Sequence, residues 1–306
     1  RIMYKKFLLV GSGDFVDSIK GALTSLALEI EIANTCQEVQ PKLNKKDIDL
    51  AIVDNDSLND AIPIIRRNKV SFVVVSAVKD TQAVIDMRSA GASDYIVKPY
   101  NIRELNLRLS AVLNSKKRIA CLGDGAGLFN ILMGLKNIPN VHLTSVVSTI
   151  DDGGSSGKLS ASFGVLPPGD VRRSLAALCN TPQVMIEILA YRFIKGGDLS
   201  GHNLGNLILT ALTKIKGSLP AAVRVLSDVL NIQGVVIPIS KTSSKLCALF
   251  EGGTVIKGES NIDLGKGRKD TLHIKNCWHE PDVEGDINAY SAIINSDILT
   301  IGPGDL

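Results

Sequence analysis

The chain has 306 residues, of which 45% are hydrophobic and 21% charged, a balance typical of globular proteins that bury a core. At roughly 150 residues per domain, this length predicts two domains. The net charge of +3 and the aromatic content of 4% provide neither a strongly basic face nor many rings for base stacking. We therefore exclude a dedicated nucleic-acid-binding protein.

Five cysteines occur without paired spacing, which is typical of reduced thiols and not of a disulfide framework or a zinc site. No apolar run approaches the about twenty residues that a membrane-spanning helix needs, and the run near the start is too short for a signal peptide. These observations predict a cytoplasmic protein without a membrane span.

The first third of the chain alternates apolar strand patterns with helical patterns. Strands are expected at residues 6–10, 28–32, 48–53, 70–75 and 95–97, and helices at 15–26, 81–90 and 102–113. Short apolar strands separated by helices indicate a parallel sheet with both faces covered. We therefore predict an α/β domain over residues 1–115, followed by a polar linker.

Residues 116–306 predict a second α/β domain. A strand at 119–122 and a helix at 128–135 flank a glycine-rich turn, and a longer strand is expected at 141–150. The segment 151–169 is rich in Gly, Ser and Pro, and its first part, residues 151–157, is expected to be a loop. Later patterns predict helices at 171–179, 184–193, 204–215, 221–230 and 289–295, a hairpin of 245–250 with 254–257, and a strand at 298–301.

Three chemically active side chains follow successive strands of the first domain. Asp54, Ser76 and Lys98 each stand just after a predicted strand, and the carboxyl ends of parallel strands meet at one sheet edge. An Asp, a hydroxyl and a Lys can together accept a phosphoryl group, hold one of its oxygens and neutralise another. With the segment Ala-Ser-Asp-Tyr-Ile-Val-Lys-Pro-Tyr at 92–100, these residues resemble the receiver domain of response regulators. The resemblance implies a flavodoxin-like sheet with Asp54 as the candidate phosphoacceptor.

The metal site of receivers is altered in this sequence. Receivers carry an acidic pair after the first strand, and here Gly11 and Ser12 stand in that place. Magnesium is usually anchored by one or two carboxylates; Asp14 and Asp56 are nearby, but neither stands where the family has its pair. Three interpretations stay open: a degenerate receiver that contacts a partner protein or forms a homodimer, a receiver phosphorylated on Asp54, and a purely structural domain.

The second domain contains two segments suited to a phosphorylated ligand. Gly123, Gly125 and Gly127 form a turn before a helix, where glycine permits close approach and the helix N-terminus offers N–H groups to an anion. The segment 151–157, Asp-Asp-Gly-Gly-Ser-Ser-Gly, brings two carboxylates that can anchor Mg²⁺ and several donors that can cradle phosphate. The alternative is a solvated loop in which Asp and Ser serve as turn residues.

Polar residues at the start of two further predicted helices can extend this site. Asp170 stands where it can cap a helix, and Arg172 in the first turn can clamp an anion. His202 and Asn206 are one helical turn apart and can share a face. With Asn203 they can contact a base, a ribose or a sugar, while His202 serves either as a general acid or base or as a structural histidine.

These segments occur in a defined order. Asp-Asp-Gly-Gly-Ser-Ser-Gly is followed by Leu-Pro-Pro-Gly-Asp-Val-Arg at 166–172, Gly-His-Asn-Leu-Gly-Asn at 201–206, Gly-Glu-Ser-Asn-Ile at 258–262 and Ile-Gly-Pro-Gly at 301–304. On this ordered set, the chain from about residue 118 onward resembles the 2-phospho-L-lactate transferase-like family, which includes the bacterial gluconeogenesis factors. The block at 258–262 and Val-Leu-Asn-Ile-Gln-Gly at 229–234 favour the gluconeogenesis-factor branch.

The resemblance implies a Rossmann-like, three-layer α/β domain with its ligand at the carboxyl ends of the strands. Asp151 and Asp152 would be the catalytic pair, orienting the ligand or binding Mg²⁺. The phosphates of the ligand would be contacted by Ser155, Ser156 and Arg172, and a nucleotide pocket would be lined by His202, Asn203 and Asn206. The expected ligand contacts also include Gly123, Gly125, Gly127, Gly153, Gly154, Asp170, Gly302 and Gly304.

Two departures from the family pattern bear on function. The first glycine turn of the family reads Gly-Gly-Gly-Thr-Gly, and Asp124 and Ala126 here bring a negative charge that weakens anion binding and remove a hydroxyl donor. Family members also continue well past the Gly-Pro-Gly turn. The second domain is therefore expected to be incomplete at residue 306, with its open sheet edge covered by a further segment or by another chain.

Three functions stay open at this point. The leading hypothesis is a cytosolic regulatory protein that binds a nucleotide sugar or a related phosphorylated ligand, which the resemblance links to carbon metabolism or cell-wall synthesis. The second is a transferase that moves a phospholactyl group from a guanosine-linked donor to a deazaflavin alcohol. The third is a non-catalytic scaffold in which both domains have degenerated.

Overall fold

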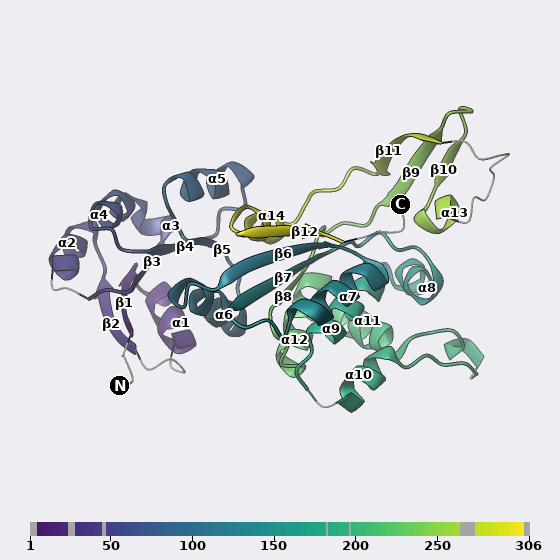
Figure 1. Ribbon diagram of the computed structural model, residues 1–306, viewed down its shortest axis with the longest axis horizontal. Helices are drawn as coiled ribbons and strands as arrows, with labels where there is room; N and C mark the ends of the chain where they lie inside the picture. Colours follow the sequence, from purple (N-terminus) through teal and green to yellow (C-terminus); the bar gives the residue numbers. More distant parts are fainter. Residues whose placement is uncertain are drawn as a thin grey trace. The chain divides into compact units, whose positions relative to one another are not determined.

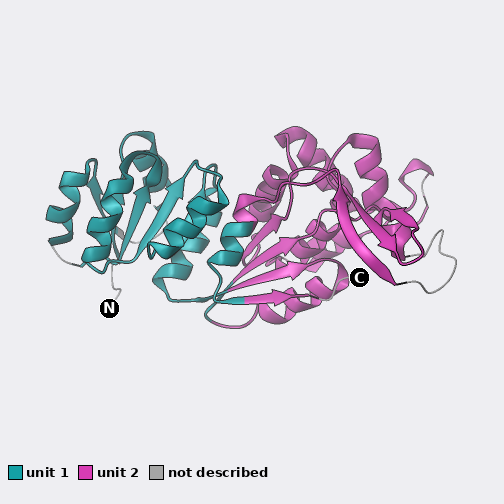
Figure 2. Ribbon diagram, turned by 90° about the horizontal axis from the view of Figure 1, so that it is seen from above, with its two compact units in different colours: residues 1–118, 140–142, 290–298 teal, residues 119–139, 143–289, 299–306 magenta. Residues whose placement is uncertain are grey.

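The structure, a computed structural model, describes residues 5–23, 28–44, 47–181, 183–195, 197–263 and 273–302. Figure 1 labels its helices and strands, and Figure 2 colours its two compact units. The first unit comprises residues 1–118, 140–142 and 290–298, and the second comprises 119–139, 143–289 and 299–306. A segment from late in the chain therefore completes the first unit.

The sheet of the first unit confirms the receiver-like, flavodoxin-like fold predicted for this region. Its five strands are parallel and lie in the order β2 (Leu28–Ala33), β1 (Lys5–Val10), β3 (Leu50–Asp54), β4 (Phe72–Ser76) and β5 (Asp94–Val97). This order, 2-1-3-4-5, is the flavodoxin-like order that receivers share. Strands β3, β4 and β5 are buried along their whole length, as expected where helices cover both faces.

Helices on the two faces of this sheet come from the segments between the strands. Helices α1 (Asp14–Leu23) and α6 (Ile102–Leu113) pack against each other, and their apolar side chains share one core with β1, β3 and β4. The other helical elements are α2 (Cys36–Asn44), α3 (Asn55–Leu58), η1 (Asn59–Ala61), α4 (Ile62–Arg67) and α5 (Thr81–Ser89). No pattern in the sequence indicated α2, which contains Pro41, or the single-turn α3.

The main sheet of the second unit has the strand order β12 (Ile298–Ile301), β6 (Lys117–Gly123), β7 (Val141–Val147) and β8 (Val235–Pro238). Strands β7 and β8 pair in parallel. The expected strand at 141–150 is therefore three residues too long, and β8 was not expected. The four apolar residues of β8 come soon after a predicted helix, and periodicity alone does not distinguish such a short apolar run from the helix.

A smaller antiparallel sheet stands beside the main one in the second unit (Figure 1). Strands β9 (Lys245–Phe250) and β10 (Val255–Lys257) form the predicted hairpin, and β11 (Ile274–Glu280) pairs with β9. Helix α13 (Glu259–Asp263) follows β10 and buries Ile262 in the small core of this sheet. Ile150 packs against the same core, which brings the hairpin to the segment that follows β7.

The helices of the second unit correct one expectation. Residues 151–157, expected to be a loop, are helical from Gly154 on, because α8 spans Gly154–Phe163 and ends at Gly164 in the left-handed conformation. The Gly- and Ser-rich composition disguised this helix, whose Ser155, Ser156 and Leu159 are buried by neighbouring elements. The other helical elements are α7 (Gly125–Leu135), α9 (Gly169–Leu178), α10 (Gln183–Ala190), η2 (Gly197–Leu199), α11 (Leu204–Lys216), α12 (Leu219–Val229) and α14 (Ile287–Ile294). None of the helices described is long and apolar enough to cross a bilayer.

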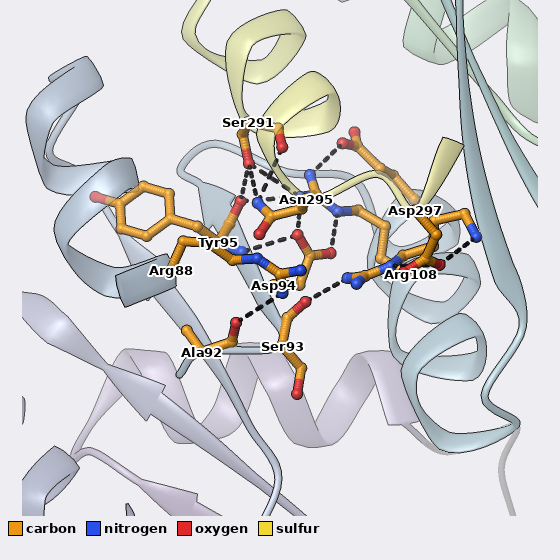
Figure 3. Close-up of polar contacts among 11 residues, drawn as sticks. Arg88, Ala92, Ser93, Asp94, Tyr95, Arg108, Ser291, Asn295 and Asp297 are labelled. Carbon is orange, nitrogen blue, oxygen red and sulfur yellow. Dashed lines mark hydrogen bonds and ion pairs between the residues drawn. The ribbon is translucent and has the colours of Figure 1, made fainter. Parts of the chain in front are cut away.

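Residues 290–298 join the first unit through a buried polar network (Figure 3). Arg108 donates two hydrogen bonds to the carboxylate of Asp94, at 2.7 and 2.6 Å, and one to the carbonyl of Tyr95 at 2.9 Å. The Ser291 hydroxyl donates to that same carbonyl at 2.7 Å. The amide of Asn295 donates to the Ser291 hydroxyl at 3.2 Å. Residues 290–298 thus supply hydrogen-bond partners to buried polar groups of β5 and α6.

Candidate functional site

Four helices of the second unit begin at one place. The N–H of Gly125 in α7 donates to Asp170 in α9 at 3.1 Å. Gly169, the first residue of α9, lies so close to Ser156 of α8 that a Cβ at this glycine would overlap the serine hydroxyl. The N–H of Asn203, the N-cap of α11, donates to the hydroxyl of Ser155 at 3.2 Å. The starts of α7, α8, α9 and α11 therefore converge, and helix starts present N–H groups and a partial positive charge to an anion.

A chain of side-chain contacts fixes the starts of α8 and α11 to each other. Ser155 lies 3.2 Å from Nδ1 of His202. Asn203 accepts a hydrogen bond from the N–H of Asn206 at 3.1 Å and donates one to the carbonyl of Ala190 at 2.9 Å. Ser155 and Asn203 are buried, while His202 is partly exposed. His202 is thus the member of this group that faces solvent.

Arg172 lies inside the protein, where its polar contacts go to protein atoms. Its Nε donates to Oδ1 of Asn206 at 3.0 Å, and its Nη1 donates to the carbonyl of Leu189 at 3.2 Å. Burial, together with the nearby charges of Arg173 and Arg192, lowers the pKa of Arg172 to about 10. In this arrangement Arg172 orients Asn206, whose amide points to the hydroxyl of Ser156 at 3.5 Å.

Asp170 does not cap a helix, although capping was one interpretation of its position. Helix α9 begins at Gly169 with Pro168 as its N-cap and has no side-chain cap. Asp170 instead accepts the N–H of Gly125 and forms an ion pair with Arg173 at 3.0 Å. Burial and the neighbouring carboxylate of Asp151 raise the pKa of Asp170 to about 6, against the opposing effect of Arg173.

Asp151 and Asp152 make different contacts. Oδ1 of Asp151 accepts the N–H of Gly153 at 2.9 Å, and its other oxygen faces the start of α9, where a Cβ at Gly169 would be 2.9 Å away. Oδ1 of Asp152 accepts the N–H of Ser260 at 2.9 Å. Asp151 therefore faces the helix starts, whereas Asp152 ties its segment to α13.

Glu259 joins this region, although the sequence singled it out only within a family-like block. Burial and the charges of Asp151, Asp124 and Asp170 raise the pKa of Glu259 to about 8. The packing of the β9–β10 hairpin and α13 brings the Glu259 side chain to the site. No local sequence pattern predicts this approach, because it depends on tertiary structure. Asp124, Asp151, Asp170 and Glu259 are called the acidic cluster below.

The acidic cluster has the charge but not the closed geometry of a metal site. Within the described ranges, no group of three His, Cys, Asp or Glu side chains is arranged to hold a metal ion. Mg²⁺ in nucleotide sites is commonly held by one or two carboxylates together with phosphate oxygens. The acidic cluster by itself therefore does not provide a complete coordination shell for Mg²⁺.

The glycine turns lie at the same strand ends. Gly123 and Gly125 adopt positive φ angles of 147° and 56°, and Gly127 lies in the first turn of α7. Gly153 and Gly154 lead into α8. The N–H of Gly302 donates to the carbonyl of Leu122 at 2.7 Å, which places Gly302 beside β6. Gly304 lies outside the described residues.

A cavity of about 370 Å³ opens at the ends of β6 and β7. Gly123 and Ile150, the chain neighbours of Asp124 and Asp151, line it, so the cavity adjoins the acidic cluster. His279 also lines it, and Nδ1 of His279 is buried with no hydrogen-bond partner among the described residues. The lining is mainly apolar and includes the hydroxyl-bearing residues Ser148, Thr149 and Ser240.

The structure also brings together the three candidates of the first unit. Lys98 donates to Asp54 at 2.7 Å, and Ser76 is buried beside them at the end of β4. The sequence therefore located this cluster, because the topology of a parallel sheet places successive strand ends side by side. Asp56 also joins this cluster, through hydrogen bonds with both Ser76 and Lys98.

Residues 119–306 match the family model described as 2-phospho-L-lactate transferase CofD. The chain belongs to this family. A gluconeogenesis factor from Listeria monocytogenes is 44% identical over 193 residues, which are 63% of this chain and 58% of the relative. A putative gluconeogenesis factor from Thermotoga maritima is 42% identical over 189 residues, which are 62% of this chain and 58% of the relative.

A solved structure from the same family has the fold of the second unit. This UPF0052 protein from Bacillus halodurans is 40% identical and aligns with a TM-score of 0.58 over 62% of this chain and 59% of the other. The likeness confirms the predicted parallel-sheet α/β domain. The chain spans less than two thirds of the length of the curated relatives described above.

Proposed function

We propose that the second unit binds a nucleotide sugar or a related phosphorylated ligand, and that the protein acts as a cytosolic regulator of carbon metabolism or cell-wall synthesis. The convergence of four helix starts is the observation that carries the proposal, because such starts attract phosphate. The name gluconeogenesis factor, which its relatives carry, supports a role in carbon metabolism. All five cysteines are free, which supports a reducing compartment.

The contacts suggest how the parts of such a ligand are held. The phosphates lie over the starts of α7 and α8, where backbone N–H groups supply donors. Asp151, with Asp170 or Glu259, would hold Mg²⁺, which would neutralise phosphate charge. The cavity beside the acidic cluster takes the base or the sugar, next to the hydroxyl-bearing residues Ser148, Thr149 and Ser240 that line it.

Thermal denaturation with and without UDP-sugars, GDP and Mg²⁺ tests the proposal. A ligand at a hundred times its dissociation constant stabilises the folded state by about 2.7 kcal/mol. The variant Asp151→Asn should lose most of the Mg²⁺-dependent part of this shift. The control Asp198→Asn, which changes an exposed aspartate of the same unit, should keep it. If none of these nucleotides shifts the melting temperature, the proposal fails.

Transfer of a phosphate-linked group is the second candidate function. Asp170 and Glu259, with pKa values of about 6 and about 8, lie near the range in which a carboxyl group can exchange protons at neutral pH. The name of the matched family, 2-phospho-L-lactate transferase, supports this candidate. Incubation with a guanosine-linked phospholactyl donor and a deazaflavin alcohol should then yield a phospholactyl-deazaflavin phosphodiester and release the guanosine nucleotide, both detected by mass. If nucleotides bind but no product forms, the transferase function is excluded and only the regulatory function remains.

A further inference from the structure

The carboxylate of Asp56 lies at the centre of the cluster in the first unit. The Ser76 hydroxyl donates to its Oδ1 at 2.6 Å, and the Lys98 ammonium donates to its Oδ2 at 2.9 Å. The backbone N–H of Ala77 donates to both oxygens, at 3.0 and 2.9 Å. A hydroxyl, an ammonium and a backbone N–H are the donors that hold the oxygens of a phosphoryl group in proteins.

Asp54, the candidate phosphoacceptor, shares these partners. Lys98 donates to its Oδ1 at 2.7 Å, and the Ser57 hydroxyl donates to its Oδ2 at 2.8 Å. Lys98 therefore bridges Asp54 and Asp56. A phosphoryl group added to Asp54 would have to displace the Asp56 carboxylate from Ser76 and Lys98, and it would stand beside a like charge.

The space beside Asp54 at the end of β1 is also filled. A Cβ at Gly11 would overlap the ring of Phe15 and would lie 3.1 Å from the Cβ of Asp54. Phe15 is only 7% exposed, and the centroid of its ring lies 5.4 Å from Nζ of Lys98, within cation–π range. An aromatic ring therefore stands where an acidic side chain at position 11 would lie.

The charges of this cluster balance one another locally. Burial raises the pKa of Asp56, but hydrogen bonds from Ser76, Lys98 and Ala77 outweigh it and hold the pKa below its usual value. Burial lowers the pKa of Lys98, but the carboxylates of Asp54 and Asp56 outweigh it and raise the pKa. Asp56 and Lys98 are therefore both charged at neutral pH.

We propose that Asp56 is a built-in substitute for a phosphoryl group. It keeps Ser76, Ala77 and Lys98 in the arrangement that a phosphoryl group on Asp54 would otherwise organise. The first unit consequently holds one state without phosphorylation and serves as a permanently ordered interaction module.

Removal of the carboxylate and its replacement by a free anion test this proposal in the full chain. Hydrogen exchange at the amide of Ala77 is the readout, because that N–H is bonded to Asp56. In Asp56→Ala we expect exchange about tenfold faster or more, which corresponds to the loss of hydrogen bonds to a charged group. Added acetate or inorganic phosphate should slow it again, while sodium chloride at equal ionic strength should not.

Two further variants make the result specific. Asp60→Ala removes an exposed aspartate from the neighbouring η1 segment and should exchange like the unaltered chain, with no response to either anion. Asp56→Ala combined with Ser76→Ala should lose the response to the anions. An Asp56→Ala chain that exchanges at the unaltered rate, or that neither anion protects, would overturn the proposal.

Incubation of the unaltered chain with Mg²⁺ and acetyl phosphate supplies an independent test that leaves Asp56 in place. We expect no gain of a phosphoryl group in the intact mass. A gain that is lost in Asp54→Asn would show that Asp56 yields its place, and the proposal would be wrong.

Discussion

At the scale of single residues, Glu259 makes the stability of the second unit dependent on pH. Its pKa rises from 4.5 to about 8 because it is buried near Asp151, Asp124 and Asp170. A carboxyl group whose pKa is higher in the folded state binds more protons when folded, so its contribution to stability is complete below the unfolded pKa and is lost as the pH rises through the folded pKa. We expect Glu259→Gln to melt about 2–4 °C or more above the unaltered chain near pH 8, and to differ little near pH 5.

The matched control is Glu251→Gln, which changes an exposed glutamate in the β9–β10 turn. Its melting temperature should follow that of the unaltered chain at both pH values. If Glu259→Gln shows the same pH profile as the unaltered chain in calorimetry, Glu259 is not the group that the acidic cluster destabilises.

At the scale of elements, the site depends on how closely the starts of α8 and α9 approach. Gly169 permits this approach, because a Cβ there would overlap the Ser156 hydroxyl and would lie 2.9 Å from Oδ2 of Asp151. We expect Gly169→Ala to destabilise the second unit by about 1–3 kcal/mol, as overpacking does, and to weaken nucleotide binding. Chemical denaturation and titration with a UDP-sugar measure the two effects.

Gly134 in α7 provides the control, because a glycine-to-alanine substitution there meets no neighbouring side chain. Nothing lies within 4 Å of a Cβ at this position, so Gly134→Ala should stabilise the chain by about 0.5–1 kcal/mol and leave binding unchanged. Equal effects of the two variants on stability and binding would contradict the role given to Gly169.

The elements that the sequence predicted well are those with a strong apolar period. Strands β3, β4 and β5 of the first unit are fully buried, so their apolar runs stood out, and Asp54, Ser76 and Lys98 could be placed at the strand ends. Helix α8 could not be predicted, because its Gly- and Ser-rich start is stabilised by contacts with α9 and α11 and not by its own propensity. Strand β11 is mostly exposed and lacks an apolar face, which removes the signal that strand prediction needs.

At the scale of the whole molecule, sequence similarity and compactness divide the chain differently. The family match runs from residue 119 to 306, yet residues 290–298 within it belong to the first unit. Polar side chains of this segment also bond the first unit; the Ser291 hydroxyl, for example, donates to the carbonyl of Tyr95, 196 positions away. No local pattern predicts a pairing of that separation. Glu259 was overlooked for the same reason, since a tertiary contact decides its position.

Replacement of Ser291 by alanine shows how far the late segment stabilises the first unit. Tyr95 would lose one of its two donors, and Arg108 and Asn295 would each lose a hydroxyl contact. Because a buried hydrogen bond contributes about 1 kcal/mol, we expect amide exchange in β5 to be about fivefold faster in Ser291→Ala. Ser296→Ala is the control, since the Ser296 hydroxyl bonds only the carbonyl of Ile293 in the same segment among the described contacts. If β5 exchanges equally fast in both variants, the late segment does not stabilise this strand through Ser291.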